Sequence, residues 1–441
     1  MVHLAKARYN KGEVIKMAYD TPLKLRELFI YQVYVRNHTE AGTFKALMAD
    51  LDRLKALGTD VVYLLPIHPI GEVSRKGTLG SPYAIKDYYA VNAELGTLDD
   101  FTALIAAIHE RGMKVMMDIV FNHTSPDSLL NKNHPEYFYH KADGSFGNRV
   151  GDWWDIIDFD YTRDPGLGKV LIDVLLYWTK LGVDGYRFDV SSFLPLDFLL
   201  KARKAVQEVD PDTIWLSESV HGDFLRMFRN EGYEALSECE LYTVFDLAYD
   251  YDTHPELEAY IKGNGSLEKY VRAVMAQEWL YPKNYVKLRN LENHDFGRIA
   301  SMVPEQTLTS WHAFSFFNKG ATMIFSGGEY SNPHHPSLFD KDPITREGKD
   351  LSPLIKTSAA LKRDPLYHEG VYELFYDGDV LIGSYTKADK QALGLFNVGA
   401  EAREIEVGWP DGTYENQLNH RRVTVKEGRV LVEADPIWLV R

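Results

Sequence analysis

Apolar segments alternate with helical patterns along most of the chain. Gly58, Gly112 and Gly182 each follow a helical pattern, and a short apolar run begins within a few residues of each glycine. A glycine just past the last helical turn is the usual C-terminal cap, and a short run of consecutive apolar residues is typical of a strand buried on both faces. The repeating unit is therefore predicted to be a helix, a glycine cap and a buried strand.

The helices between these strands have start signals of their own. Thr97 precedes Asp100 by three residues, which is a capping pattern, and apolar residues then recur at helical spacing. Strands are predicted near residues 28–35, 61–66, 114–121, 183–189, 213–218, 240–247, 285–291 and 321–326. Eight strands that alternate with helices predict an α/β fold. They favour a closed (β/α)8 TIM barrel over an open sheet.

Two regions depart from this rhythm. Residues 124–164 are rich in aromatic residues, Gly, Asn and His, and we interpret them as an inserted domain after the third strand, overhanging the catalytic face. After residue 364 short strand-like runs are broken by turn residues, which indicates a C-terminal antiparallel β-sandwich domain. The predicted division is a catalytic barrel of residues 1–123 and 165–364, an inserted domain of residues 124–164 and a C-terminal domain of residues 365–441.

Composition narrows the classes of partner and compartment. The formal charge is -15, and no run of basic residues occurs, so nucleic acid and anionic membranes are poor partners. Cys239 is the single cysteine, which excludes an intramolecular disulfide and fits a reducing compartment. No stretch has the apolar length of a signal peptide or a membrane span, so we expect a cytoplasmic protein. Composition makes no prediction about the oligomeric state.

Three acidic residues end, or nearly end, predicted strands: Asp189, Glu218 and Asp295. The C-terminal ends of parallel barrel strands meet on one face, which is where barrel active sites lie. Two carboxyl groups in different protonation states can break an acetal, because one protonates the departing oxygen while the other stabilises the cationic centre. The pattern therefore points to acid/base chemistry on an uncharged substrate.

The neighbours of two acids suggest how their roles divide. Arg187 and Asp189 are two residues apart on one strand, so both side chains point to the same face, and the guanidinium favours the ionised carboxylate that a nucleophile requires. Glu218 follows Trp215 and Leu216, where partial desolvation favours the protonated form of a general acid. Taken alone, an Arg-x-Asp pair is more typical of a buried ion pair, and isolated histidines such as His123 are more typical of structural positions.

The sequence motifs match a known family in order. The segments 118–123 (Asp-Ile-Val-Phe-Asn-His), 185–189 (Gly-Tyr-Arg-Phe-Asp), Glu218 at a strand end and 293–295 (Asn-His-Asp) resemble the signature segments of the α-amylase family, glycoside hydrolase family 13. Further segments at 81–89 and 320–329 resemble those after the second strand and at the eighth strand of that family. The resemblance runs from about residue 28 to the end of the chain.

The resemblance implies a role for each matching residue. It implies that Asp189 is the nucleophile, Glu218 the acid/base and Asp295 the stabiliser of the distorted sugar. The other implied assignments are Tyr83, His123, Arg187 and His294 as substrate-binding residues and Asp118 and Asn122 as supports behind them.

Two positions depart from the family pattern. Many secreted relatives have a Lys-His pair three and four residues after the nucleophile, where this chain has Ser192 and Phe193. The loop at residues 36–42 also lacks the repeated Asp/Asn pattern that some relatives use for calcium. We therefore expect no required cofactor and no metal site, because the sequence does not support a bound Ca²⁺.

The resemblance predicts a retaining enzyme that cleaves α-1,4-glucosidic bonds of malto-oligosaccharides or starch-type glucans through a covalent glycosyl-enzyme intermediate. The alternatives are a 4-α-glucanotransferase on the same scaffold and a non-catalytic carbohydrate-binding barrel. Four aromatic residues could pack in local cores or stack on sugars, and the sequence leaves both roles open: Trp153, Trp154, Trp279 and Tyr281.

Overall fold

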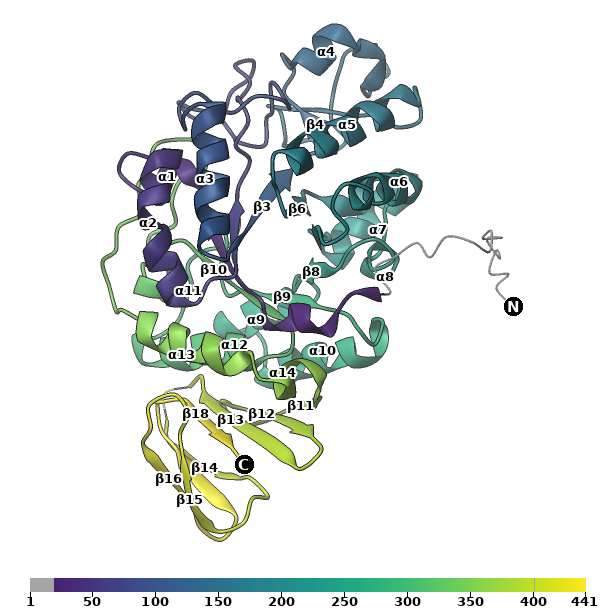
Figure 1. The fold of residues 1–441 in the computed structure, drawn as a ribbon. Helices are drawn as coiled ribbons and strands as arrows, with labels where there is room; N and C mark the ends of the chain where they lie inside the picture. Colours follow the sequence, from purple (N-terminus) through teal and green to yellow (C-terminus); the bar gives the residue numbers. More distant parts are fainter. Residues whose placement is uncertain (1–19, 400) are drawn as a thin grey trace.

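The computed structural model describes residues 20–399 and 401–441, and within them parallel strands close an eight-stranded barrel (Figure 1). The ring order is β1-β2-β3-β6-β7-β8-β9-β10, and β10 pairs with β1. The strands are β1 (Phe29–Val33), β2 (Val61–Leu64), β3 (Lys114–Ile119), β6 (Gly185–Phe188), β7 (Ile214–Ser217), β8 (Leu247–Tyr249), β9 (Lys287–Arg289) and β10 (Ala321–Phe325). The predicted closed parallel barrel is confirmed.

The sixth strand was predicted in the wrong place. The prediction was residues 240–247, whereas β8 begins at Leu247 and Glu238–Leu241 form the short helix α8. A capping box starts this helix, because the Glu240 carboxylate accepts a hydrogen bond from the Ser237 N–H at 2.7 Å. The local cap therefore starts a helix in a segment whose apolar residues resemble a strand. The strand β8 itself lies further along the chain and ends at Tyr249.

Helices cover the outside of the barrel, and their ends follow the predicted signals. The box at Thr97 is present, since its Oγ1 accepts from the Asp100 N–H at 3.1 Å and the Asp100 carboxylate accepts from the Thr97 N–H at 3.1 Å. Gly58 ends its helix with a φ of 103°, a left-handed conformation that glycine adopts without a Cβ clash.

The α-helices are α1 (Val35–His38), α2 (Phe44–Leu57), α3 (Leu98–Glu110), α4 (Leu129–Asn133), α5 (Gly166–Lys180), α6 (Leu196–Gln207), α7 (Gly222–Asn230), α8 (Glu238–Leu241), α9 (His254–Ile261), α10 (Leu267–Leu280), α11 (Ile299–Met302), α12 (Leu308–Phe317), α13 (Ser352–Lys362) and α14 (Pro365–Glu369). The 3-10 helices are η2 (Leu23–Glu27), η3 (Pro135–Tyr137), η4 (Ser191–Phe193), η5 (Glu305–Thr307) and η6 (Gly328–Tyr330). In the described part of the chain, none of the helices has the length and apolar character that crossing a bilayer would require.

Side chains of the barrel strands alternate between an inner and an outer core. Ile30, Met116 and Leu216 belong to the cluster inside the barrel, whereas Tyr186 and Trp215 pack toward the helices. This alternation follows from the two-residue period of a strand, and it makes the barrel interior a packed core rather than a channel. Arg187, next to outward-facing Tyr186, therefore points into the top of the barrel.

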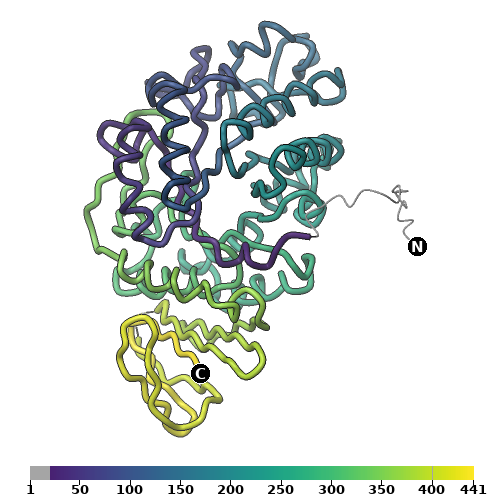
Figure 2. The backbone as a smooth tube through the Cα atoms, in the orientation of Figure 1, coloured from purple at the N-terminus to yellow at the C-terminus, as the bar shows by residue number. Residues whose placement is uncertain are grey.

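The chain between β3 and α5 leaves the barrel, as predicted for an insertion after the third strand. It contains α4, η3 and a two-stranded antiparallel pair, β4 (His123–Thr124) and β5 (Ile157–Asp158). Figures 1 and 2 show the part around α4 at the opposite end of the molecule from the C-terminal strands. Because β4 begins at His123, this pair ties the insertion directly to a predicted site residue.

The C-terminal region is antiparallel β structure, as predicted. Its sheets are β11-β12-β13-β18, β14-β17 and β15-β16. The strands are β11 (Val371–Asp377), β12 (Val380–Lys387), β13 (Lys390–Asn397), β14 (Arg403–Glu406), β15 (Gly412–Glu415), β16 (Arg422–Val425), β17 (Arg429–Val432) and β18 (Ile437–Val440). The predicted domain boundaries stay a prediction.

The ring of Phe317 at the end of α12 joins the C-terminal sheet to the barrel. It packs against Trp438 with the ring centroids 4.8 Å apart, and it covers two glycines of the sheet. A Cβ on Gly383 would lie 2.5 Å from the Phe317 ring, so this close approach requires glycine.

Candidate active site

The three predicted acids converge on one cavity at the C-terminal ends of the strands. Asp189 follows β6, Glu218 follows β7 and Asp295 lies in the loop after β9. All three line a cavity of about 350 Å³. The other lining residues are Lys76, Ser81, Tyr83, His123, Trp153, Asp155, Ile156, Val190, Ser219, Val220, His221, Phe224, Tyr251, His294, Phe296, Leu338 and Phe339.

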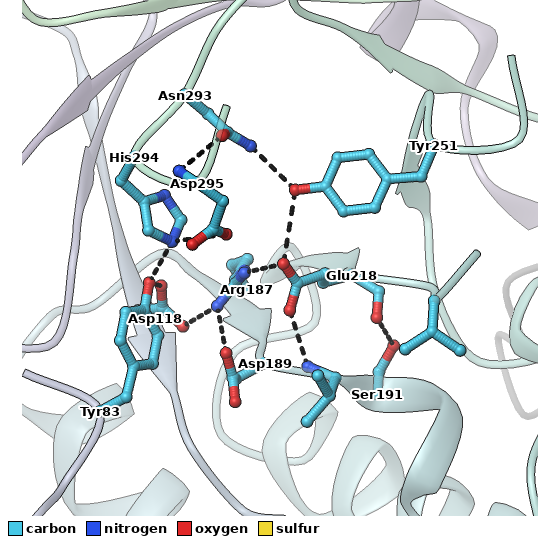
Figure 3. A network of polar contacts seen from close by, with 12 residues as sticks. Tyr83, Asp118, Arg187, Asp189, Ser191, Glu218, Tyr251, Asn293, His294 and Asp295 are labelled. Atoms are coloured by element: carbon cyan, nitrogen blue, oxygen red, sulfur yellow. Dashed lines mark hydrogen bonds and ion pairs between the residues drawn. The ribbon is translucent and has the colours of Figure 1, made fainter. Parts of the chain in front are cut away.

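Arg187 lies among Asp118, Asp189 and Glu218 and contacts all three (Figure 3). Its buried guanidinium donates from Nη1 to Asp118 Oδ1 at 2.7 Å and to Asp189 Oδ1 at 3.0 Å. Its Nη2 makes an ion pair with Glu218 Oε1. The sequence suggested a partner for Asp189 alone, whereas one guanidinium binds Asp118, Asp189 and Glu218 together.

Glu218 is held by the turn that follows Asp189. The Val190 N–H donates to Glu218 Oε2 at 2.8 Å, and Val190 has a φ of 35°. A left-handed conformation is unfavourable for a β-branched residue and costs on the order of 1–3 kcal/mol. The Tyr251 hydroxyl donates to Glu218 Oε1 at 3.4 Å and accepts from Asn293 Nδ2 at 2.8 Å. Glu218 thus receives contacts from the segments that follow β6 and β8, and Asn293 supports it through Tyr251.

A tight turn presents the third acid. Asn293 Oδ1 accepts hydrogen bonds from the N–H groups of Asp295 and Phe296, both at 2.8 Å. Asp295 Oδ2 lies 3.2 Å from His294 Nε2, and the Asp295 side chain keeps 45% of its surface exposed. The turn therefore directs this carboxylate toward the open part of the cavity.

Tyr83 and His294 form a stacked pair on one wall. Their ring centroids are 5.5 Å apart with planes 15° apart, and the Tyr83 hydroxyl lies 2.6 Å from His294 Nε2. Gln32 Nε2 lies 3.1 Å from the other ring nitrogen. Tyr83 and Tyr63 both donate to Asp118 Oδ2, at 3.0 and 2.7 Å, so Asp118 links this wall to Arg187.

His123 lies on another side of Asp189. Its Nε2 is 3.9 Å from Asp189 Oδ2, and Asn122 Nδ2 donates to its Nδ1 at 3.1 Å. Because Nδ1 accepts that bond, the ring proton of neutral His123 resides on Nε2, the nitrogen that faces Asp189. Asn122 therefore fixes the tautomer and the orientation of this ring.

Burial sets the protonation of the histidines. It lowers the pKa of His294 to about 3, with a further contribution from the Arg187 cation. Burial also lowers the pKa of His123 to about 3, and the Lys76 ammonium adds to this effect. Both rings are therefore neutral near pH 7 and can donate or accept hydrogen bonds without adding charge to the cavity.

Burial acts in the opposite direction on the acids. It raises the pKa of Asp189 well above the usual range, and the nearby carboxylates of Glu218, Asp118 and Asp295 act in the same direction. Burial also raises the pKa of Asp118 to about 6. The pKa of Asp295 is raised as well, because the surrounding protein partly desolvates its carboxylate even though the side chain remains 45% exposed. Arg187 opposes the shift at Asp189, as the sequence suggested, but burial outweighs it.

The two positions that depart from the family pattern serve packing and backbone contacts. Ser192 Oγ accepts from the Val220 N–H at 3.1 Å, and the Phe193 ring stacks on Phe228 with centroids 3.9 Å apart. In residues 20–399 and 401–441, no group of three or more His, Cys, Asp or Glu side chains is placed to hold a metal ion. No step of the chemistry proposed below involves a metal ion.

Several lining residues were missed from the sequence. Tyr251 lies two residues after β8, so the misplaced sixth strand hid a position that a correct strand end would have marked. Trp153, whose role the sequence left open, lines the cavity with its ring centroid 5.5 Å from that of His123, and it also packs on a small core. Trp154 and Trp279 are largely exposed, and Tyr281 donates to Asp252.

Comparison with known proteins identifies the family. Residues 29–149 and 150–369 match the model of the α-amylase catalytic domain, and residues 373–439 match that of the bacterial α-amylase C-terminal domain. An α-amylase from Lactobacillus plantarum is 43% identical, with a TM-score of 0.93 over 95% of this chain and 100% of that chain. A noncanonic maltogenic α-amylase from Thermotoga neapolitana is 32% identical, with a TM-score of 0.84 over 95% of this chain and 99% of that one.

A curated relative has a different activity. The α-1,4-glucan:maltose-1-phosphate maltosyltransferase of Mycolicibacterium smegmatis is 34% identical over 261 residues, which are 53% of this chain. The match spans only 37% of the length of that transferase. The family-model match covers well over half of this chain, including every strand of the barrel and the convergent acids. The chain therefore belongs to the α-amylase family and is a carbohydrate-active enzyme of that family.

Proposed function

We propose that this enzyme is a retaining hydrolase of α-1,4-glucosidic bonds in malto-oligosaccharides or starch-type glucans. The observation that carries the proposal is the shared contact of Asp189 and Glu218 with the Arg187 guanidinium. Carboxyl groups in retaining enzymes lie about 5 to 5.5 Å apart, whereas inverting enzymes separate them by about 6.5 to 9.5 Å to admit a water molecule. Contact with neighbouring nitrogens of one guanidinium favours the closer, retaining arrangement.

In the first step, an Asp189 carboxylate oxygen attacks the anomeric carbon of the bound glucose unit. The bond from that carbon to the glycosidic oxygen breaks, and Glu218 transfers its proton to the departing oxygen. The products are a glycosyl ester on Asp189, an ionised Glu218 and the released sugar. Val190 N–H and Tyr251 Oη hold Glu218 in position for this transfer.

In the second step, Glu218 accepts a proton from a water molecule while the water oxygen attacks the anomeric carbon. The ester bond to Asp189 breaks, which returns Asp189 to its ionised form and Glu218 to its protonated form. Arg187 stays in contact with both residues, so its cation balances whichever carboxylate carries the negative charge.

The remaining residues would bind and orient the sugar. Asp295, exposed toward the cavity, is placed to accept hydrogen bonds from sugar hydroxyls, and neutral His123 and His294 can bond the same ring. Tyr83 would present its ring to the sugar while its hydroxyl stays bonded to Asp118. Asn122 would not contact the sugar; it would orient the His123 ring through its hydrogen bond to Nδ1.

A second candidate is a 4-α-glucanotransferase, in which a sugar hydroxyl replaces water in the second step. The maltosyltransferase relatives favour this candidate, because they share the family and transfer a glycosyl group. The α-amylase from Lactobacillus plantarum favours hydrolysis, because it matches over nearly the whole chain at higher identity. The non-catalytic alternative has no support, since all three acids converge on the cavity. Starch as the natural substrate and a cytoplasmic location rest on the sequence alone.

Incubation with maltoheptaose and chromatography of the products test the proposal. Hydrolysis is expected to yield only sugars shorter than maltoheptaose, whereas a ladder that includes longer sugars would favour the transferase. Unchanged maltoheptaose would overturn both candidates. Asp189→Asn serves as the inactive control, because it keeps the shape of the site and removes the nucleophile.

A further inference from the structure

Three loops that are distant in the sequence meet at one end of the cavity. Lys76 comes from the loop after β2, Trp154 and Asp155 from the segment between β4 and β5, and Phe339 from the loop after β10. Lys76 Nζ forms an ion pair with Asp155 Oδ1 at 2.8 Å and lies 4.6 Å from the centroid of the Trp154 ring and 5.9 Å from that of Phe339. We call these four residues, together with Thr78 and Asp340, the loop bridge.

Further contacts lock the loops after β2 and β10 together. Asp340 Oδ1 accepts from the Thr78 N–H at 2.8 Å and from the Thr78 hydroxyl at 2.6 Å. The Leu79 N–H donates to the Phe339 carbonyl at 2.9 Å. Gly77, with a φ of 60°, makes this approach possible, because a Cβ there would lie 2.6 Å from Phe339 Cβ. The loops therefore touch through backbone as well as side chains.

A buried arginine supports the loop bridge from beneath. Arg36 Nη1 donates to the Gly80 carbonyl at 3.1 Å and to the Leu338 carbonyl at 3.2 Å, so it ties the same two loops. Its side chain is 1% exposed and paired with Glu94 at 3.1 Å. Arg36 therefore holds the loops after β2 and β10 in place from the protein interior.

The loop bridge is also a wall of the cavity. Lys76, Asp155 and Phe339 all line the cavity. The side chain of Lys76 is 17% exposed and that of Asp155 is 4% exposed, so salt screens this ion pair less than a surface pair. The cavity of about 350 Å³ is at the small end of the usual range for ligand sites.

The order of the strands places this wall opposite the proposed general acid. The bridge loops follow β10, β2 and β3, which are grouped around β1 in the ring. Glu218 follows β7 and Tyr251 follows β8, on the other side of the ring. Because Glu218 would protonate the departing oxygen, the leaving part of the glucan lies on its side, and the retained part points toward the loop bridge.

We infer that the loop bridge closes the donor end of the cleft, so that the enzyme acts at the non-reducing ends of glucan chains and releases short oligosaccharides. The retained glucose units extend from the attacked carbon toward the non-reducing end, which is the direction in which Lys76, Asp155 and Phe339 line the cavity. This inference rests on the proposed function, since it takes the position of the leaving group from Glu218.

Two forms of one substrate test the inference. One is p-nitrophenyl maltoheptaoside, and the other carries a benzylidene acetal across O4 and O6 of the non-reducing glucose. The blocked form is expected to be cleaved at least about tenfold more slowly, because the added group clashes with the wall. Chromatography measures all products, so cleavage at any bond is detected.

Variants then assign the effect to the loop bridge. Lys76→Ala removes the ion pair and is expected to raise the rate on the blocked form, relative to the free form, by about fivefold or more. Lys169→Ala is the matched control, because it breaks an exposed Lys–Asp pair of 2.6 Å on α5, and it should leave the ratio unchanged. Asp340→Ala, which loosens the Thr78 contact, is the second bridge variant if Lys76→Ala does not fold.

The outcomes separate the two proposals. Equal rates of the wild-type enzyme on both substrate forms would overturn the closed donor end and leave the hydrolase proposal standing. A blocked-to-free ratio that no folded bridge variant changes would also overturn the role of the loop bridge. Cleavage of neither form would overturn the hydrolase proposal, and the inference with it.

Discussion

Replacement of Arg187 by lysine is expected to lower kcat/KM sharply while the protein stays folded. The lysine keeps one buried positive charge, but its ammonium is a single point, whereas the guanidinium is a planar fork. In the native site this fork contacts Asp118 at 2.7 Å and Asp189 at 3.0 Å and also pairs with Glu218. Lysine therefore cannot keep all three contacts at once.

The size of the loss follows from the number of contacts. A hydrogen bond to a charged group contributes about 1.5–3 kcal/mol, so one lost contact at about 2 kcal/mol lowers kcat/KM by about 30-fold. Two lost contacts at about 4 kcal/mol in total lower it by about 1,000-fold. Arg187→Met should instead destabilise the fold by about 3–5 kcal/mol, because it leaves buried carboxylates without a counter-charge.

The pH profile gives a second measurement of the same effect. Attack requires ionised Asp189, so kcat/KM falls as the pH drops through the pKa of this group. Burial raises that pKa and Arg187 opposes the rise. With the weaker contact from lysine the pKa rises further, and the acid limb of the profile moves to higher pH.

Initial rates on maltoheptaose across pH, together with thermal melting, would measure both effects. Arg111→Lys is the matched control, since Arg111 pairs with Asp52 at 2.7 Å on the surface and should tolerate the change. If Arg187→Lys kept kcat/KM within about threefold of the wild type and left the acid limb in place, the organising role of Arg187 would be refuted.

Three further changes separate catalysis from stability. Asp189→Asn should abolish product formation while the circular dichroism spectrum stays unchanged. Near-native turnover would mean that another residue is the nucleophile. Tyr251→Phe removes a donor to Glu218 at 3.4 Å and should lower kcat by about tenfold at constant KM, a loss of about 1–1.5 kcal/mol; an unchanged kcat would leave Tyr251 without a positioning role. Thr97→Ala removes a capping box and should lower the free energy of unfolding by about 1 kcal/mol in denaturant titrations; a change in kcat/KM would contradict a purely structural role.

Local signals predicted the architecture well, because they act within a few residues. The glycine cap at Gly58 and the capping box at Thr97 both depend on contacts inside one turn of chain. The prediction failed at β8 for the same kind of reason, since a local cap at Ser237 began a helix within an apolar run that resembled a strand. That error also concealed Tyr251 as a neighbour of Glu218.

The sequence alone determined the barrel, the C-terminal β domain and the identities of the acids that meet at the strand ends. Strand periodicity and the parallel arrangement make such residues converge wherever the barrel closes. Only the tertiary structure decided that Arg187 binds Asp118, Asp189 and Glu218 together, that burial raises the pKa of Asp189, and that Lys76 and Asp155 form part of a wall. These properties depend on desolvation and on partners from distant strands and loops, and no local pattern encodes such distances.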